Sequence, residues 1–252
     1  MDFEPFMCNF DNKIKIIDMK KSLSILLLMA VSFGFAQDKA AQLVDAYIKA
    51  IGGQKKIASV KSVLQKQTIS QMGQEIEVES YQNVNGDGYM KMNMAGMDLI
   101  VYAVKDGKGF RMNQMMGYDE LSPEEVKKME DKHGKIFGDI VYMKDKEGKI
   151  KYLGTEEMDG KKYEVVELKQ DENSFKLYFD PETHLLKYTV VDTDNGTVVN
   201  EIAEYKEVDG LKFPSKMVTK VGDQTLSTIE VKEIILNPKE DQIDQEAFKM
   251  PE

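Results

Sequence analysis

The residues of this chain that could do chemistry are mainly methionines, and seven of its 17 methionines lie between Met90 and Met116. Met90, Met92 and Met94 alternate along one predicted strand, so their side chains share one face. Three interpretations are open: an ordinary core strand, a cavity for an apolar ligand, or a Cu(I) site. A flexible, polarizable thioether suits adaptable apolar surfaces, and thioethers also select Cu(I), although histidines to assist them are missing.

We expect these methionines and their neighbours to line a cavity that takes acyl chains. Burying a dozen methylenes at ~0.8 kcal/mol each could outweigh the cost of ordering the ligand. The predicted lipid-binding residues are Met90, Met92, Met94, Met97, Leu99, Val101, Phe110, Met112, Met115 and Met116, with Ile136, Phe137 and Ile140 from a helical insertion.

Other chemistries find little support in the sequence. His133 and His184 fall in different predicted elements, so we expect two exposed histidines and no zinc site. Asp192 to Gly196 resembles the start of a calcium loop, but its glycine comes one place early, and we interpret it as a turn. No Gly-x-Ser-x-Gly elbow and no phosphate-binding glycine loop are present. We therefore expect a binding protein without metal or cofactor; a Ser-His-Asp hydrolase is the enzymatic alternative.

The first 36 residues resemble a signal peptide. Lys20 and Lys21 precede an apolar run over 23–36 that ends in Gly-Phe-Ala, which predicts cleavage before Gln37 and a periplasmic location. Residues 1–18 form a doubtful upstream leader. An uncleaved signal anchor is the alternative, although the run is short for a membrane span. The only cysteine, Cys8, lies upstream of this site. Residues 37–252 then form a single domain.

The formal net charge of −10 argues against a nucleic-acid partner, whose phosphates require a basic surface. It also argues against tight adhesion to anionic lipid headgroups. We expect a soluble monomer.

Turn and strand signals organise the rest of the chain. An apolar stripe predicts a helix over 38–51, and Asn-Gly and Asp-Gly turns divide 61–113 and 149–235 into two antiparallel meanders. Between them Ser122 and Glu125 form a capping box that opens a helical insertion over 122–143. The polar tail carries Ile243 and Phe248 as possible anchors. The predicted fold is α+β: one antiparallel sheet of about 11 strands, which must curl, close or be covered by helices.

Several stretches resemble the LolA-like outer-membrane lipoprotein-sorting family of periplasmic lipoprotein carriers. They are IKAIGGQKKIASVKS, YFDPETHLLKY, EYKEVDGLKFPSK and the ending LNPKEDQIDQEAFKMP. The resemblance implies a strongly curved sheet that forms an incomplete β-barrel, with helices over its mouth and acyl chains of a lipid or lipoprotein in its hollow. An envelope protein-interaction module on the same scaffold, without lipid, is the alternative.

Overall fold

The structure is a computed structural model that describes residues 39–94, 96–113, 115, 117–143, 149–170 and 173–251. The predicted signal peptide and the cleavage before Gln37 lie outside the described residues. In the part described, no helix is long and apolar enough to cross a membrane.

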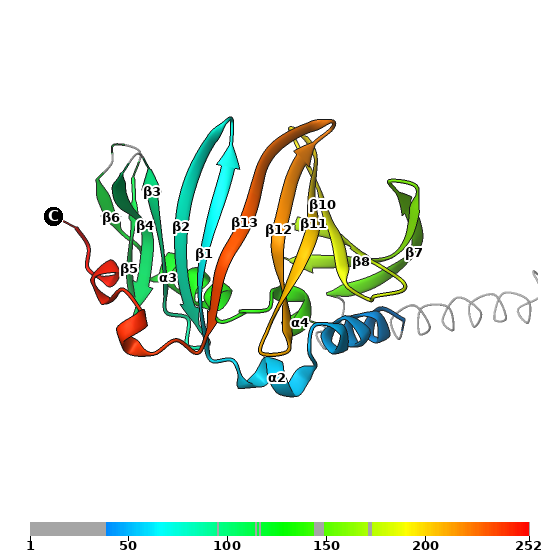
Figure 1. Ribbon diagram of the computed structural model, residues 1–252, viewed down its shortest axis with the longest axis horizontal. Helices are drawn as coiled ribbons and strands as arrows, with labels where there is room; N and C mark the ends of the chain where they lie inside the picture. The colour runs from blue at the N-terminus through cyan, green and yellow to red at the C-terminus, as the bar shows by residue number, and fades with distance from the viewer. Residues whose placement is uncertain are drawn as a thin grey trace, which may run out of the picture.

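Thirteen antiparallel strands form one sheet in the order β6-β5-β4-β3-β2-β1-β13-β12-β11-β10-β9-β8-β7 (Figure 1). The first meander comprises β1 (Ser62–Gln71), β2 (Gln74–Asn83), β3 (Gly88–Met94), β4 (Met97–Lys105), β5 (Lys108–Met112) and β6 (Tyr118–Glu120). The second comprises β7 (Ile150–Met158), β8 (Lys161–Gln170), β9 (Asn173–Phe179), β10 (Leu186–Thr193), β11 (Gly196–Val208), β12 (Leu211–Val221) and β13 (Gln224–Leu236).

The two predicted meanders join because the last strand pairs with the first. In the β1–β13 pair, Val63 lies opposite Leu236 and Ile69 opposite Ile229. Consequently β6 and β7, although consecutive in the chain, form opposite edges of the sheet. The connection between them carries α3 (Pro123–His133) and α4 (Asp139–Met143), and it runs behind the sheet in Figure 1.

This arrangement corrects two details of the predicted fold. The sheet has 13 strands rather than about 11, and it is open rather than strongly curled or closed. Closing a barrel would require β6 to pair with β7, but β6 has only three residues and its Asp119 and Glu120 are exposed. The single antiparallel sheet agrees with the prediction, whereas the predicted α+β class reduces to a mostly-β protein with few helices.

The predicted hairpin turns form as their sequences require. Asp106-Gly107, Asp159-Gly160 and Asp209-Gly210 have positive φ at both positions, which two-residue hairpin turns of the favoured type need. Met72-Gly73 adopts the same conformation, with a φ of 50° at Met72. Methionine is an unusual residue at such a turn position. Each turn fixes the register of its hairpin, so the strands within each meander follow the order of the sequence.

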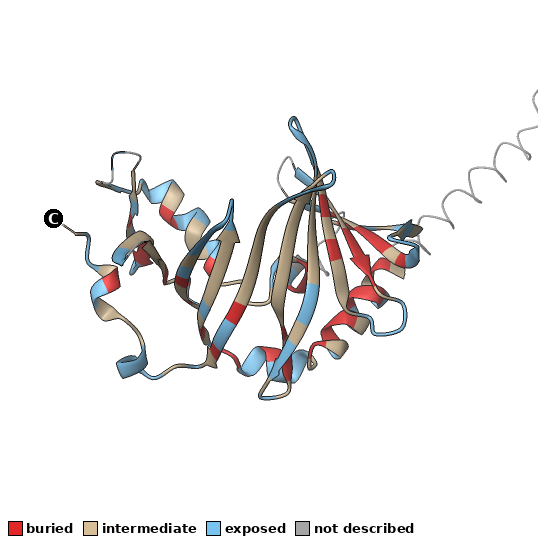
Figure 2. Cartoon of the chain, turned by 45° about the horizontal axis from the view of Figure 1, so that its top comes forward, coloured by how far each residue is buried: buried red, intermediate tan, exposed pale blue. Residues whose placement is uncertain are grey.

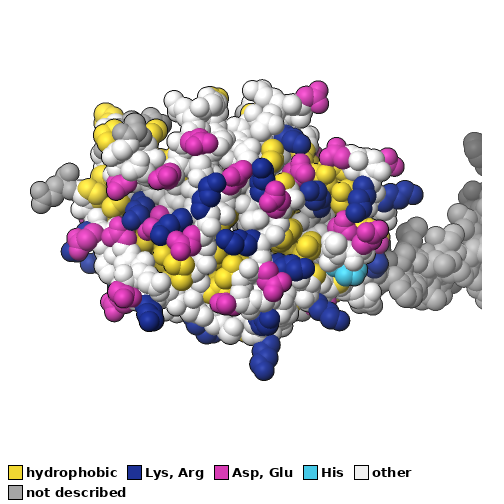
Figure 3. Space-filling view, viewed as in Figure 1, with side chains coloured by type: hydrophobic (Ala, Val, Ile, Leu, Met, Phe, Trp, Pro, Cys, Tyr) yellow, Lys and Arg dark blue, Asp and Glu magenta, His cyan; other side chains and the backbone are white. Residues whose placement is uncertain are grey.

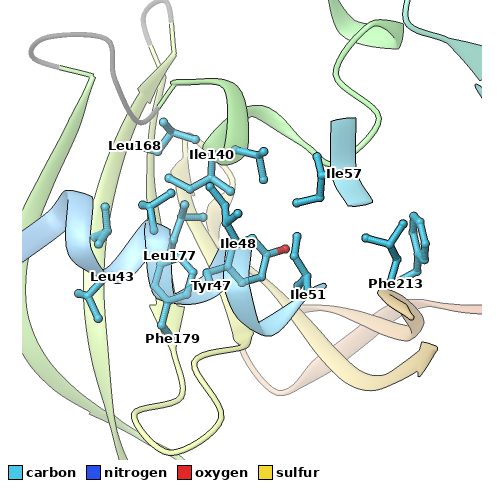
Figure 4. Close-up of a cluster of buried hydrophobic side chains, with 14 of the residues drawn as sticks. Leu43, Tyr47, Ile48, Ile51, Ile57, Ile140, Leu168, Leu177, Phe179 and Phe213 are labelled. Atoms are coloured by element: carbon cyan, nitrogen blue, oxygen red, sulfur yellow. The ribbon is translucent and has the colours of Figure 1, made fainter. Parts of the chain in front are cut away.

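The larger core lies on the helical face of the second meander (Figure 2). A helix over 39–50, drawn blue in Figure 1, buries the predicted stripe of Ala40, Leu43, Val44, Tyr47 and Ile48. Tyr47 meets Phe179 edge-on, with ring centroids 5.5 Å apart, and Figure 4 shows the surrounding aliphatic side chains. The helix ends at Ala50, and a turn through Gly52 leads to α2 (Gln54–Ser59).

The opposite face of the sheet carries a separate, smaller core under the first meander. Ala247 and Phe248 in the C-terminal turn η2 (Gln245–Phe248) pack with Tyr81 and Tyr89, and Ile243 also contributes. Another turn in the same tail, η1 (Glu240–Gln242), precedes η2 in the chain. Both predicted anchors, Ile243 and Phe248, therefore hold the tail on the sheet.

The capping box predicted at the start of α3 is present. The Ser122 hydroxyl accepts from the Glu125 backbone N–H at 3.3 Å, and the Ser122 backbone N–H donates to the Glu125 carboxylate at 2.9 Å. Two orphan N–H groups are thereby satisfied, which defines where this helix begins.

Candidate functional site

A cavity of about 500 Å3 lies on the helical face of the second meander. Its floor is the sheet, and its other walls come from the end of the 39–50 helix and from the segment that leads into α4. The apolar lining consists of Tyr47, Ile51, Ile136, Phe137, Ile140, Leu168, Phe175, Leu177, Leu186, Ile202, Phe213, Pro214, Met217 and Val231. The volume is typical of small-molecule sites, which cover about 300–1,000 Å3.

The segment over 136–140 covers one side of this cavity. Phe137 packs on Phe213 of β12 with ring centroids 5.4 Å apart. Gly138, with a φ of 81°, redirects the chain into α4, where Ile140 is buried. Lys135 and Asp139 form an ion pair at 2.7 Å, which holds the ends of this turn together.

Few polar groups reach the cavity. Gln65, Asp139, Gln170, Thr189 and Lys212 complete its lining. Burial raises the pKa of Tyr47 to about 12, and the Tyr205 hydroxyl beside it donates to the Leu186 carbonyl at 2.8 Å. Both phenols therefore stay neutral across physiological pH. The lining combines a wide apolar surface with scattered polar groups, which suits binding of an apolar ligand better than acid–base chemistry.

Three of the predicted lipid-binding residues, Ile136, Phe137 and Ile140, line this cavity. The methionines of β3 do not, but Met92 lies on the same face of the sheet. A row of directly paired residues runs from the cavity wall across three strand pairs: Val231, Gln67, Val78 and Met92, followed by Leu99. Residues paired directly share a face, so the methionines extend the cavity side of the sheet.

Register places the other predicted residues in two groups. Met90 is paired with Tyr102, Met92 with Leu99, and Met94 with Met97, so all lie on the helical face. Phe110 instead belongs to the smaller core on the opposite face, and Met112 shares that face by alternation.

The remaining predicted residues lie outside these two faces or are not described. Val101 falls at a bulge between the pairs Met90–Tyr102 and Lys91–Ile100. Met115 is 90% exposed in the turn before β6. Met116 lies outside the described residues. The predicted set therefore does not form one cavity, and whether its members contact lipid stays a prediction.

A second, smaller hollow of about 330 Å3 adjoins β1, β2 and β3. Most of its lining is charged or polar, including Lys66, Glu79 and Lys91, which form one cross-strand row. This row lies on the face opposite the side chains of Met92 and Val78, which border the hollow. Lys91 pairs with Glu79 at 3.1 Å and with Asp244 at 2.8 Å. Figure 3 shows basic and acidic side chains intermixed over the face of the sheet that is turned away from α3 and α4. Because these charges neutralise one another, this hollow is a weaker ligand site than the first.

The second meander supplies lining residues that were not predicted from the sequence. These residues come from three strands: Phe175 and Leu177 from β9, Ile202 from β11, and Phe213 and Met217 from β12. Their alternation along each strand indicates one buried face, but only the pairing of distant strands brings them around one hollow.

The expectation of two exposed histidines was wrong for His133, which is 2% exposed. Its Nδ1 lies 2.9 Å from the Gly86 carbonyl oxygen and its Nε2 3.3 Å from the Tyr102 hydroxyl. Burial is the main cause that lowers the pKa of His133. A neutral ring whose Nδ1–H donates to Gly86 fits this environment, so the residue fastens α3 to the sheet.

His184 is exposed in the turn between β9 and β10, with a φ of 58°. The same turn is held by Asp180, whose carboxylate accepts from the backbone N–H groups of Glu182 and Thr183 at 2.9 Å each. Throughout the described residues, no three His, Cys, Asp or Glu side chains gather as a metal site.

Comparison with known proteins identifies the fold. No protein-family model and no curated protein matches the sequence. A DUF1329 family protein from Desulfovibrio piger matches with a TM-score of 0.51 at 10% identity, covering 83% of this chain and 99% of that chain. A LolA superfamily protein from Nitrosomonas europaea matches with a TM-score of 0.52 at 10% identity, covering 81% and 96%. A putative outer membrane lipoprotein-sorting protein domain from Vibrio parahaemolyticus has a TM-score of 0.49 at 9% identity, covering 82% and 96%. The predicted similarity to LolA-like proteins is thereby confirmed at the level of the fold.

Proposed function

We propose that this protein is a non-enzymatic carrier that holds an acyl chain of a lipid or lipoprotein in the cavity over the second meander. The observation that carries the proposal is the cavity of about 500 Å3 between the sheet and its helical cover, with a mainly apolar lining. A fully close-packed core would leave no such space. The LolA-like fold supports a carrier role of the outer-membrane lipoprotein-sorting type, in the periplasm.

The energetics favour a long apolar ligand. About a dozen buried methylenes would contribute roughly 10 kcal/mol at ~0.8 kcal/mol each. Association costs an estimated 4–15 kcal/mol in lost freedom, which offsets much of this gain and keeps the ligand releasable. Reversible binding of this kind is what a carrier needs.

Lipid extraction and native mass spectrometry of protein purified from an envelope fraction test the proposal. We expect a bound species with acyl chains, and we expect less of it after Ile202→Phe, which adds volume inside the cavity. Val218→Phe is the matched control, because Val218 is paired with Glu201 on the opposite face. Absence of lipid in the wild-type protein, together with no binding of fluorescent fatty acids, would rule the carrier function out.

A protein-interaction role on the same scaffold is the second candidate. β7 is an edge strand of nine residues with Leu153 37% exposed, and an edge strand can pair with a strand of another protein. Stoichiometric co-purification of an envelope protein without lipid would select this alternative. Ester hydrolysis that disappears in His184→Ala would instead select a hydrolase.

A further inference from the structure

Three methionines come together at the end of the β3–β4 hairpin. Met92, Met94 and Met97 follow the spacing M-x-M-x-x-M, with Ala95 and Gly96 between the paired residues Met94 and Met97. Gly96 has a φ of 82°, as a tight hairpin turn allows. Because Met92 and Met94 are two residues apart in one strand, and Met97 is opposite Met94, all three side chains lie on one face.

The register brings their sulfur atoms within reach of one ion. Directly paired residues have Cβ atoms about 4.5–5.5 Å apart, and diagonal neighbours lie about 7–8 Å apart. A methionine side chain is unbranched and has three rotatable bonds, so the three thioethers can converge above the strands. Met97 is 58% exposed, which leaves an entry path from solvent.

The oxygen-bearing side chains near this hairpin end, which are hard ligands, lie on its opposite face. Asn93 donates to the Asp98 carboxylate at 2.7 Å and accepts from the Gly96 backbone N–H at 3.2 Å. Glu77 is paired with Asn93 and shares that face, whereas the methionine side has Val78 beside Met92. The carboxylates are thus turned away from the thioethers, so the methionine face offers soft, neutral ligands.

We propose that Met92, Met94 and Met97 bind one Cu(I) ion. Thioethers select soft Cu(I), whereas divalent ions such as Zn²⁺ and Mg²⁺ prefer imidazole or oxygen ligands. The described part of the chain contains no cysteine, so thioethers are its only sulfur ligands. His133 is buried against Gly86 and Tyr102 and does not belong to this hairpin end. The site does not depend on the acyl-chain cavity, whose lining excludes all three methionines.

Anaerobic titration of the full chain with Cu(I), against a chromophoric chelator that competes for the ion, tests the proposal. We expect one Cu(I) per chain and a first shell of sulfur in X-ray absorption. The triple variant Met92→Leu/Met94→Leu/Met97→Leu should weaken binding by more than the roughly 10- to 100-fold that loss of an outer-shell partner costs. Leucine preserves volume and apolar character, so the variant should fold, as a thermal unfolding curve verifies.

Met158→Leu, at the far edge of the sheet, is the matched control and should bind Cu(I) as the wild type does. Absence of Cu(I) binding, a first shell of nitrogen or oxygen, or unchanged binding by the triple variant would each overturn the proposal. If the wild type and the triple variant bind fatty acids equally while neither binds Cu(I), the methionines act only as apolar surface. If the wild type binds Cu(I) but no fatty acid, the carrier function is overturned and the copper site stands.

Discussion

The ring of Phe137 lies against the ring of Phe213, with centroids 5.4 Å apart and planes inclined by 33°. This contact joins the segment before α4 to β12 and closes one side of the cavity. Aromatic pairs contribute about 0.5–1.5 kcal/mol beyond the area they bury. We expect a coupling free energy of that size in a double-mutant cycle of Phe137→Leu and Phe213→Leu, measured by urea unfolding. Strictly additive losses would mean that the segment does not rest on β12.

A side chain at Gly52, in the turn after the 39–50 helix, should destabilise the fold. A Cβ there would lie 2.6 Å from the Gly210 carbonyl oxygen and 2.8 Å from the Leu211 side chain. Gly53 is the matched control, because its φ of 88° is also strained for alanine but a Cβ would meet open space. Backbone strain alone costs about 1–3 kcal/mol, so Gly53→Ala should lose about that much stability. Gly52→Ala should lose clearly more in the same urea titration; equal losses would disprove the close approach.

His133 should make the stability depend on pH below its ordinary pKa. The groups around its ring are the Gly86 carbonyl, the Tyr102 hydroxyl, Asp87, Glu130 and Lys132. Because burial lowers its pKa in the folded state, the unfolded chain binds the proton more readily as the pH falls below about 6.5. The stability contributed by the neutral ring is therefore present above that pH and decreases toward the lower folded pKa.

Urea unfolding between pH 7 and pH 5 checks this prediction against His133→Gln, which can still donate to the Gly86 carbonyl but does not titrate. The wild type should lose more stability over this interval than the variant. Parallel losses in both proteins would show that carboxylates, and not His133, control the response.

Asp180 should stabilise the turn between β9 and β10. Burial opposes ionisation, but the Lys161 ammonium at 2.7 Å and two backbone N–H groups outweigh it, so the pKa of Asp180 falls to about 2. Its contribution is present above the ordinary pKa of 3.8 and is lost as the pH falls through about 2. Because the Lys161 side chain is about half exposed and solvent screens the ion pair, Asp180→Ala should cost only about 1 kcal/mol at pH 7. Asp194→Ala, in the exposed turn before β11, should cost less in the same assay.

The local architecture could be predicted because it depends on neighbouring residues. Asp-Gly turns, the Ser122–Glu125 capping box and the helical stripe of Leu43, Val44 and Tyr47 each carry their physical cause within a few positions. β6 was missed because three residues, two of them acidic, give no strand pattern. The pairing of β1 with β13 joins residues more than 150 positions apart, and no local signal specifies it.

The position of the site was harder to predict for the same reason. The local density of methionines favoured a site at β3 and β4, whereas the cavity of about 500 Å3 forms where Tyr47, Phe137 and Phe213 meet from three distant segments. The burial of His133 likewise depends on a distant glycine. A Cβ on Gly88 would lie 2.8 Å from its Nδ1, so the ring fits only because that position has no side chain.

A single tryptophan inside the cavity over the second meander can report whether an acyl chain binds there, as we claim. The chain has no tryptophan, so Phe175→Trp would place the only indole in the cavity lining. Val218→Trp is the matched control on the opposite face of the sheet. We predict saturable quenching of the Phe175→Trp fluorescence by a brominated fatty acid, at one ligand per chain, with little quenching of Val218→Trp. Equal quenching of both variants, or none in either, would contradict the claim.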